Sequence, residues 1–193
     1  MKVLVVYAHP NPQSYNHAVL EAFTKGLKEA GHTFEVDDLY ASKFDPCLKV
    51  EDYAQFTGGQ MPQDVLGEQA KVAKAEALVF IYPVWWWSVP AILKGWIDRV
   101  LSHGFAYKMT ESEEIEGLLK HKKALIINST MSPEAYYKDS GVEDAMKKII
   151  DNATFKEICG IQNLEHVFLY AVDFDAEARK RYLELTYRLG KEF

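Results

Sequence analysis

Five short apolar runs stand out along the chain, and each has the pattern of a β-strand. They cover residues 3–7, 33–36, 77–82, 124–128 and 167–172. Apart from the short second run, they are continuously apolar and show no alternation with polar residues. That pattern is typical of parallel strands that are covered on both faces.

Helical patterns alternate with these runs. Val19, Phe23 and Leu27 recur at helical spacing, and Gly31 ends that helix. Further helical patterns cover residues 69–74, 89–102, 142–150 and 176–189. Residues 40–67 are polar and irregular, so no regular element is expected there.

The alternation of strands and helices predicts an α/β fold, a doubly wound five-stranded parallel sheet with helices on both faces. Its rhythm favours the flavodoxin-like strand order 2-1-3-4-5. Ligands of such sheets bind beyond the carboxyl ends of the strands, where the winding direction reverses between strands 1 and 3. We therefore expect a functional site in the loops after Tyr7, Tyr82 and Asn128.

The first of these loops reads HPNPQSYN and lacks the GxGxxG fingerprint of nicotinamide dehydrogenases. Ser14 can cap the following helix and leave the amides of Tyr15 and Asn16 facing outward at its positive end. Such an end binds phosphate, and His9 could add a donor. A structural interpretation stays open, in which Ser14 only caps the helix and His9 only makes local hydrogen bonds.

The second loop carries three consecutive tryptophans, Trp85, Trp86 and Trp87, directly before a helix whose first turn contains Pro90. Trp96 lies on the inward face of that helix and is expected in the core. The three loop indoles instead suit a flat aromatic ligand beside the phosphate site. The alternative is that they cover a dimer interface or a sheet edge. A planar redox ring with a phosphate tail, such as FMN, matches both loops.

Composition narrows the class of protein. A chain of 193 residues, 48% hydrophobic and 26% charged, predicts one globular domain over residues 1–193. The net charge of -6 argues against nucleic-acid binding, and no apolar run has the length of about 20 residues needed to span a membrane. We interpret the N-terminal apolar run as a strand and not as a signal peptide, so a cytoplasmic location is expected. Cys47 and Cys159 lie far apart without metal-ligand spacing.

Two segments carry a resemblance to a known family. YAHPNPQSYNHA and YPVWWWSVPAILKGWIDRVLSHGFAYK resemble the NAD(P)H:quinone oxidoreductases of the flavodoxin-like superfamily, which include DT-diaphorase and the modulator of drug activity B type. The resemblance implies a bound flavin, two-electron reduction of quinones or related acceptors by NAD(P)H, and a homodimer whose active sites are completed across the interface.

The resemblance also implies roles for particular residues. The flavin phosphate region would be held by His9, Ser14, Tyr15, Asn16 and Ala18. The isoalloxazine ring would be held by Pro83, Val84, Trp85, Trp86 and Trp87. Tyr107, from the GFAY segment, would line the substrate pocket.

The chain departs from the family pattern at the loop after strand 4. Where relatives usually have TTGG, the sequence has Ser129, Thr130, Met131 and Ser132. Amides of this loop, with the hydroxyl of Tyr137, could stabilise negative charge on a reduced flavin. A surface or interface role is the alternative for Tyr137.

Two further departures concern the catalytic group and the cofactor. The histidine that follows the tyrosine in DT-diaphorase falls near Glu143, so no catalytic histidine is assigned. The insertion that helps to hold the adenosine of FAD is missing, which favours FMN over FAD.

The expected reaction is a ping-pong cycle in which NAD(P)H and the acceptor use one site in turn. Two rival functions share the fold. One is a flavodoxin-like electron carrier, although the chain lacks a Ser/Thr-Gly-rich phosphate loop and a strongly acidic face. The other is a flavin-bearing regulatory subunit of a membrane transporter of the potassium-efflux type, which could keep the same flavin site.

Overall fold

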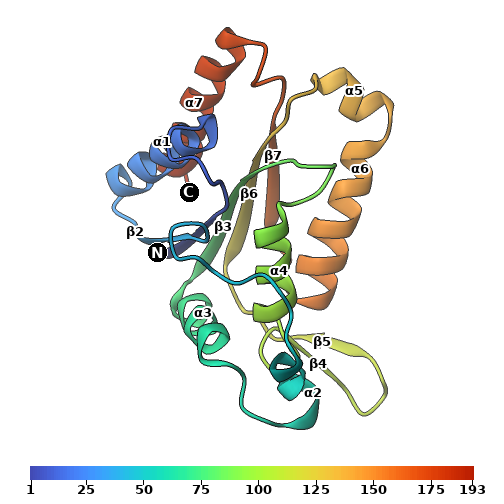
Figure 1. The fold of residues 1–193 in the computed structure, drawn as a ribbon. Coiled ribbons are helices and arrows are strands. Elements are labelled where there is room, and N and C mark those ends of the chain that lie inside the picture. The colour runs from blue at the N-terminus through green and yellow to red at the C-terminus, as the bar shows by residue number, and fades with distance from the viewer.

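A sheet of five parallel strands forms the centre of the computed structural model, which describes residues 1–193 (Figure 1). The strands are β1 (Lys2–Tyr7), β2 (Thr33–Asp38), β3 (Ala77–Pro83), β6 (Lys123–Ser129) and β7 (Leu164–Leu169). Their order across the sheet is β2-β1-β3-β6-β7. This is the predicted order 2-1-3-4-5, because β4 and β5 belong to a separate hairpin. The predicted fold class is confirmed.

Helices cover both faces of the sheet, as Figure 1 shows. Helices α1 (Tyr15–Glu29) and α7 (Ala176–Lys191) lie on one face. The other face is covered by α3 (Gln63–Lys74), α4 (Ala91–Val100) and α6 (Val142–Lys147). A stretch of π-helix, η2 (Lys148–Ile158), continues α6, and the short α5 (Glu134–Asp139) precedes it.

The face of α1 and α7 depends on a close helix crossing. A Cβ atom on Gly26 would lie 2.3 Å from the carbonyl oxygen of Tyr187, and one on Gly190 would lie 2.2 Å from that of Phe23. Both distances are far inside van der Waals contact. The two backbones can therefore approach only because neither glycine carries a side chain.

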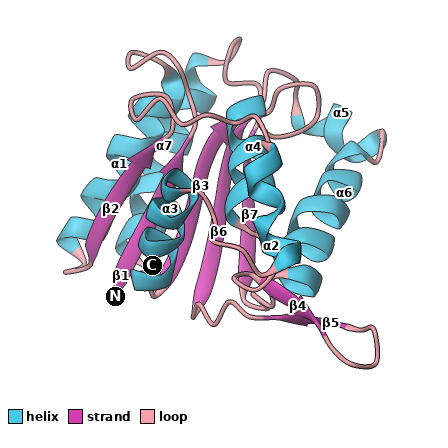
Figure 2. Cartoon of the chain, turned by 60° about the horizontal axis from the view of Figure 1, so that its bottom comes forward, coloured by secondary structure: helices cyan, strands magenta, loops and turns pink.

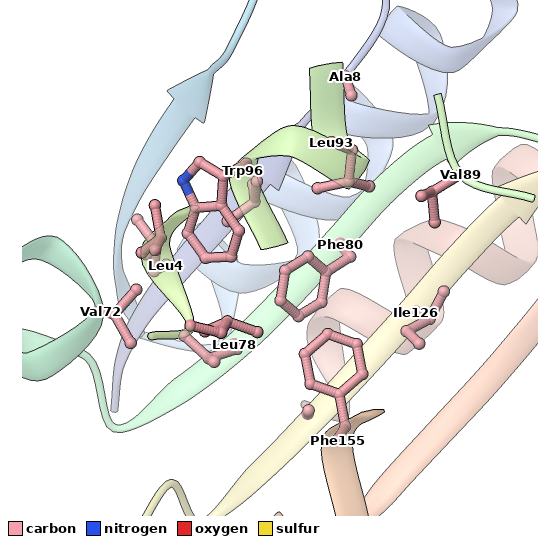
Figure 3. Close-up of a cluster of buried hydrophobic side chains, with 14 of the residues drawn as sticks. Leu4, Ala8, Val72, Leu78, Phe80, Val89, Leu93, Trp96, Ile126 and Phe155 are labelled. Carbon is pink, nitrogen blue, oxygen red and sulfur yellow. The ribbon is translucent and has the colours of Figure 1, made fainter. Parts of the chain in front are cut away.

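On the opposite face, aromatic and branched side chains interlock between the sheet and α4, α3 and η2 (Figure 3). The rings of Phe80 and Phe155 lie 4.8 Å apart between centroids. Trp96 is fully buried beside them, and its Nε1 donates to Glu68 Oε2 at 2.9 Å. Trp96 is therefore a core residue, as its position on the helix predicted.

Several element boundaries differ from the sequence-based expectation. The fifth strand begins at Leu164 and ends at Leu169, three residues earlier at each end than the predicted 167–172. It is an edge strand with an exposed Glu165, so its polar start hid the pattern. The last helix of the opposite face runs on as η2 to Ile158, well past residue 150.

Residues 40–67 are more ordered than their composition indicated. They contain η1 (Val50–Tyr53), a 3-10 turn, the short α2 (Ala54–Thr57), and the start of α3. The buried Arg99 of α4 anchors this segment. It donates to both carboxylate oxygens of Asp52, at 2.9 and 3.1 Å, and to Asp64 at 2.8 Å. Because Arg99 and Asp52 are both 0% exposed, this ion pair fixes the segment against α4.

An antiparallel hairpin that was not predicted projects away from the main sheet (Figure 2). Its strands are β4 (Tyr107–Met109) and β5 (Ile115–Gly117), each only three residues long. Such short runs carry too few residues for a periodicity signal. Among the helices of the structure, none combines the length and the apolar character that crossing a bilayer would require.

Candidate functional site

A cavity of about 530 Å³ opens at the carboxyl ends of β1, β3 and β6, where the winding of the sheet reverses. Its size falls within the range of small-molecule sites. The residues that line it are His9, Ser14, Tyr15, Asn16, Pro83, Val84, Trp85, Trp86, Ser129, Thr130, Met131, Val172 and Asp173. The structure thus brings the three predicted loops together around one space.

The first wall is the start of α1. Ser14 is its N-cap residue, and Ser14 Oγ accepts from the amide of His17 at 3.2 Å. The amides of Tyr15 and Asn16 precede the first intrahelical hydrogen bond of the helix, so they remain available to an anion. The capping interpretation and the ligand interpretation of Ser14 are therefore compatible.

His9 combines a local hydrogen bond with a place in the wall. His9 Nδ1 lies 3.1 Å from the amide nitrogen of Asn11 and 3.2 Å from its carbonyl oxygen, so Nδ1 holds the ring to this loop. Burial lowers the pKa of His9, partly offset by its bond to the backbone of Asn11. The His9 ring therefore borders the cavity with Nδ1 engaged locally.

Tyr15 and Asn16 hold the wall in place through their side chains. The Tyr15 hydroxyl donates to the carbonyl oxygen of Arg179 at 3.0 Å, and burial strongly raises the Tyr15 pKa. Asn16 is buried, and its Nδ2 donates to Ser129 Oγ at 2.9 Å. This bond joins the first loop to the third across the floor of the cavity.

The second wall is a tight turn over residues 85–88. Trp85 and Ser88 exchange backbone hydrogen bonds, both at 3.1 Å. The two central residues, Trp86 and Trp87, have φ angles of 50° and 55°, in the left-handed region that bulky residues rarely adopt. Such strain persists where the surroundings impose it and is concentrated at functional sites.

The turn explains why three indoles occur in a loop. Trp86 is 89% exposed, and Trp85 and Trp87 are 40% and 47% exposed. The ring of Trp85 lies 6.1 Å from the ring of His9, so the first and second walls meet there. Trp85 and Trp86 line the cavity, and none of the three indoles fills the core.

The third wall lacks glycine, and hydrogen bonds hold it to the end of β7. The amide of Thr130 donates to Leu169 at 2.8 Å, and Thr130 Oγ1 donates to the carbonyl of Ser132 at 2.9 Å. The Thr130 amide is therefore already engaged and is not free for a ligand. Ser129 and Thr130 are buried, whereas Met131 is exposed at the rim.

Tyr137 lies on α5 beside the cavity. It borders an adjoining hollow of about 160 Å³ together with Trp87. The Tyr137 side chain is buried against the rings of Phe168 and Tyr170, at 6.1 and 5.8 Å between centroids. Burial raises the pKa of Tyr137, with a smaller opposing effect of the Thr130 hydroxyl. The alternative that Tyr137 is an exposed surface residue does not fit this burial.

The Glu143 carboxylate accepts hydrogen bonds from two side chains, and Tyr137 is not one of them. Its Oε1 accepts from Lys147 and its Oε2 from the hydroxyl of Tyr170, both at 2.5 Å. Burial acts to raise the Glu143 pKa, but these two hydrogen bonds outweigh it and the pKa is lowered. The carboxylate is therefore held ionised between a lysine and a tyrosine.

Besides Tyr137, three predicted site residues lie outside the cavity. Ala18 is one turn inside α1, where its amide donates to the Ser14 carbonyl at 3.3 Å. Trp87 faces the adjoining hollow. Tyr107 is on β4 and lines a separate groove of about 500 Å³ with Tyr53 and Phe56.

Two wall residues were missed in the sequence. Val172 and Asp173 line the cavity from the loop after β7. The rule that selected the other loops applies to them too, because they follow the carboxyl end of a strand. The predicted strand was extended to residue 172 and so covered this loop.

Comparison with known proteins now places the chain. A family model described as a flavodoxin-like fold matches residues 1–188. The chain belongs to this flavodoxin-like family. The resemblance inferred from the sequence is confirmed by relatives whose names include quinone oxidoreductases.

Three members of this flavodoxin-like family illustrate the similarity. A Haemophilus influenzae protein named an NAD(P)H oxidoreductase is 37% identical over 96% of this chain and 92% of its own length. The ribosyldihydronicotinamide dehydrogenase [quinone] of Rattus norvegicus is 31% identical over 93% of this chain and 86% of its own length. The structure of an NAD(P)H:quinone oxidoreductase from Methanothermobacter marburgensis has a TM-score of 0.90 at 36% identity, and covers 99% of this chain and 98% of that one.

Proposed function

We propose that this chain is a flavin-dependent NAD(P)H:quinone oxidoreductase and that its cavity binds the flavin. The observation that carries the proposal is the meeting of a capped helix N-terminus and a strained tryptophan turn around one space at the switch point of the sheet. The first suits a phosphate and the second a flat ring. The relatives named as quinone oxidoreductases support the same activity.

The wall residues fit FMN better than FAD. No lysine or arginine side chain lines the cavity, and Asp173 contributes a carboxylate. A phosphate there would be held by amides and by the helix dipole, with Ser14 and His9 as neutral donors. Such a set suits a single phosphate. We therefore propose FMN as the resident flavin and NAD(P)H as the co-substrate.

The ring would lie between the second and third walls. A bound flavin supplies hydride transfer between NAD(P)H and a quinone. The protein's part is alignment: the backbone of residues 83–85 borders one edge, Trp86 stands exposed at the opening, and Met131 covers the rim. Tyr137, protonated because burial raises its pKa, can donate a hydrogen bond to an acceptor in the adjoining hollow.

Tyr107 lies outside the cavity of its own chain, and we propose that it acts at the cavity of a second copy of the chain. The Tyr107 groove is apolar and bordered by exposed side chains, with Tyr53 at 56% and Phe56 at 60% exposure. Exposed aromatic side chains of this kind are enriched at protein interfaces. In a homodimer, Tyr107 would complete the substrate pocket of the partner, as the family resemblance implies.

The test is NADPH oxidation in the presence of menadione, measured with the flavin-loaded protein. Ser14→Ala removes a donor at the phosphate and the cap of α1, so FMN affinity is expected to fall about fivefold, the factor that corresponds to the roughly 1 kcal/mol of a capping hydrogen bond. Thr24→Ala, which removes a hydroxyl further along the same helix, should keep wild-type affinity. A loaded wild type that leaves NADPH unoxidised would refute the enzymatic function.

A further inference from the structure

A hydrogen-bonded chain of three polar side chains, with a buried tyrosine beside it, crosses the sheet just below the cavity. Tyr82 of β3 is paired with Asn128 of β6 in the sheet register. Asn128 Nδ2 lies 2.6 Å from Nε2 of His166 on β7, and His166 Nδ1 lies 2.7 Å from Oδ1 of Asp151 on η2. The side-chain hydrogen bonds therefore link β6, β7 and the helix that covers them, and Tyr82 of β3 lies beside Asn128.

The four side chains are shielded from water. Tyr82 and Asn128 are 1% and 0% exposed, and the side chains of His166 and Asp151 are 1% and 8% exposed. Apolar residues surround Tyr82, and the ring of His166 is stacked on that of a phenylalanine at 4.2 Å. Replacing a buried ion pair by well-packed apolar side chains often leaves the stability of a protein unchanged or raises it. A buried polar chain at this place therefore points to a role other than stability.

The hydrogen bonds of the chain share one direction. The amide of Asn128 donates to Nε2, so His166 carries its proton on Nδ1 and donates it to the carboxylate of Asp151. Asn128 Oδ1 and the Tyr82 hydroxyl are both buried and have no hydrogen-bond partner. Burial raises the pKa of Tyr82, with a smaller opposing effect of Asn128. The two hydrogen bonds from Asn128 through His166 both run towards Asp151.

The widened helix places Asp151 at this point. Ile150 and Phe155 are both buried and are five residues apart, a spacing that the wider turn of a π-helix, with its i→i+5 hydrogen bonds, brings towards one face. Asp151, which directly follows Ile150, is buried as well. π-Helical segments are uncommon and often accompany functional sites.

We propose that Asp151 and His166 are positioning residues for the cavity, which fix Asn128 and thereby the end of β6 that carries its third wall. The next register pair, Pro83 and Ser129, lines the cavity directly. The inference rests on the proposed flavin function.

The experiment measures FMN binding by the apoprotein through quenching of FMN fluorescence. His166→Phe and Asp151→Leu are each expected to weaken binding about tenfold, the lower end of the loss known for groups that orient metal ligands. Asp151→Asn keeps an acceptor for Nδ1–H and should bind nearly as the wild type does. His121→Phe is the matched control, because His121 is half-buried near the start of β6 and bonds only the carbonyl of Val72.

The double variant Asp151→Leu with His166→Phe separates positioning from stability. It leaves no unpaired charge, so it should fold, and FMN binding should remain weak. Recovery of wild-type affinity in the double variant would overturn the proposal. Equal affinity of the single variants and the wild type would overturn it too, whereas a wild type that binds no flavin would refute the proposed function on which it rests.

A second readout uses the unmodified protein. The ¹⁵N signals of the His166 ring report which nitrogen carries the proton. We expect a protonated Nδ1 and an unprotonated Nε2 near neutral pH, with or without flavin. A protonated Nε2 would show that the donor direction is different, and would overturn the positioning chain without reference to flavin binding.

Discussion

The two faces of the sheet are built on different principles. The face of α1 and α7 is packed with apolar side chains, and its closest contacts join backbones at Gly26 and Gly190. All the buried charged side chains of the molecule belong to the opposite face, where each is paired with a basic or acidic side chain. These residues are Asp37, Asp52, Glu68, Arg99, Glu143 and Asp151. One face depends on shape and the other on paired charges.

The difference teaches where the fold accommodates function. Buried ion pairs add little net stability, but removing one partner is costly, so they fix position more than they strengthen the fold. On the polar face, Arg99 fixes the segment that borders the Tyr107 groove, and His166 lies beneath the cavity. The apolar face has no comparable device. We expect substitutions on the two faces to differ in kind.

The largest effect is expected for Arg99→Met on the polar face. The substitution leaves Asp52 buried without its counter-ion, so the free energy of unfolding should fall by about 3–5 kcal/mol. Urea unfolding followed by circular dichroism measures it. Adding Asp52→Leu should recover much of the loss, and a single variant as stable as the wild type would contradict the account.

The apolar face should respond to volume alone. Gly190→Ala places a Cβ 2.2 Å from the Phe23 carbonyl, and the overpacking should cost about 1–3 kcal/mol. The loss should be the same at every pH, because no ionisable side chain is involved. Gly67→Ala in α3 is the control: its Cβ meets nothing within 4 Å, so this variant should be at least as stable as the wild type.

Asp37 should make the polar face sensitive to pH. Burial and the nearby Glu68 raise the pKa of Asp37 to about 7, against the opposing effect of Lys71. Between about pH 4 and 7 the folded protein therefore holds a proton that the unfolded chain has lost. Stability should fall as pH rises through this window, by an amount on the order of 1–3 kcal/mol.

The Asp37→Asn variant isolates this contribution. Its stability should change less with pH over the same window, since the side chain no longer titrates. Thermal melting of both proteins in one buffer series makes the comparison. Parallel pH profiles for the two proteins would show that Asp37 does not hold the proton.

The smallest effect is expected at the tryptophan turn. Trp86→Gly relieves a φ of 50°, so it should stabilise the fold by about 1 kcal/mol while weakening flavin binding. Thermal melting and a flavin titration together measure the trade between stability and binding. A Trp86→Gly protein that melts at a lower temperature and binds flavin normally would show that the backbone strain at Trp86 plays no part in flavin binding.

The sequence predicted those parts of the fold whose signals are local. Strands β1, β3 and β6 are continuous apolar runs, so their carboxyl ends and the three loops could be located directly. Ser14 and Trp96 were placed by helix rules alone. Of the predicted flavin residues, only Ala18 and Trp87 lie outside the cavity wall.

The remainder depends on contacts between distant residues. Arg99 and Asp52 are 47 residues apart, and no periodicity links them. His166 is a polar residue in an edge strand, and its partners Asn128 and Asp151 come from other elements. Tyr107 belongs to a three-residue strand in a separate groove. None of these pairings leaves a mark within one window of sequence.

The central claim is that the cavity between the α1 N-terminus and the tryptophan turn binds a flavin. The most direct measurement is the visible absorption spectrum of the purified protein, followed by identification of the flavin that denaturation releases. The account predicts a yellow protein that yields one FMN per chain, or a colourless one that takes up FMN when it is offered. A colourless protein that binds neither FMN nor FAD would contradict it.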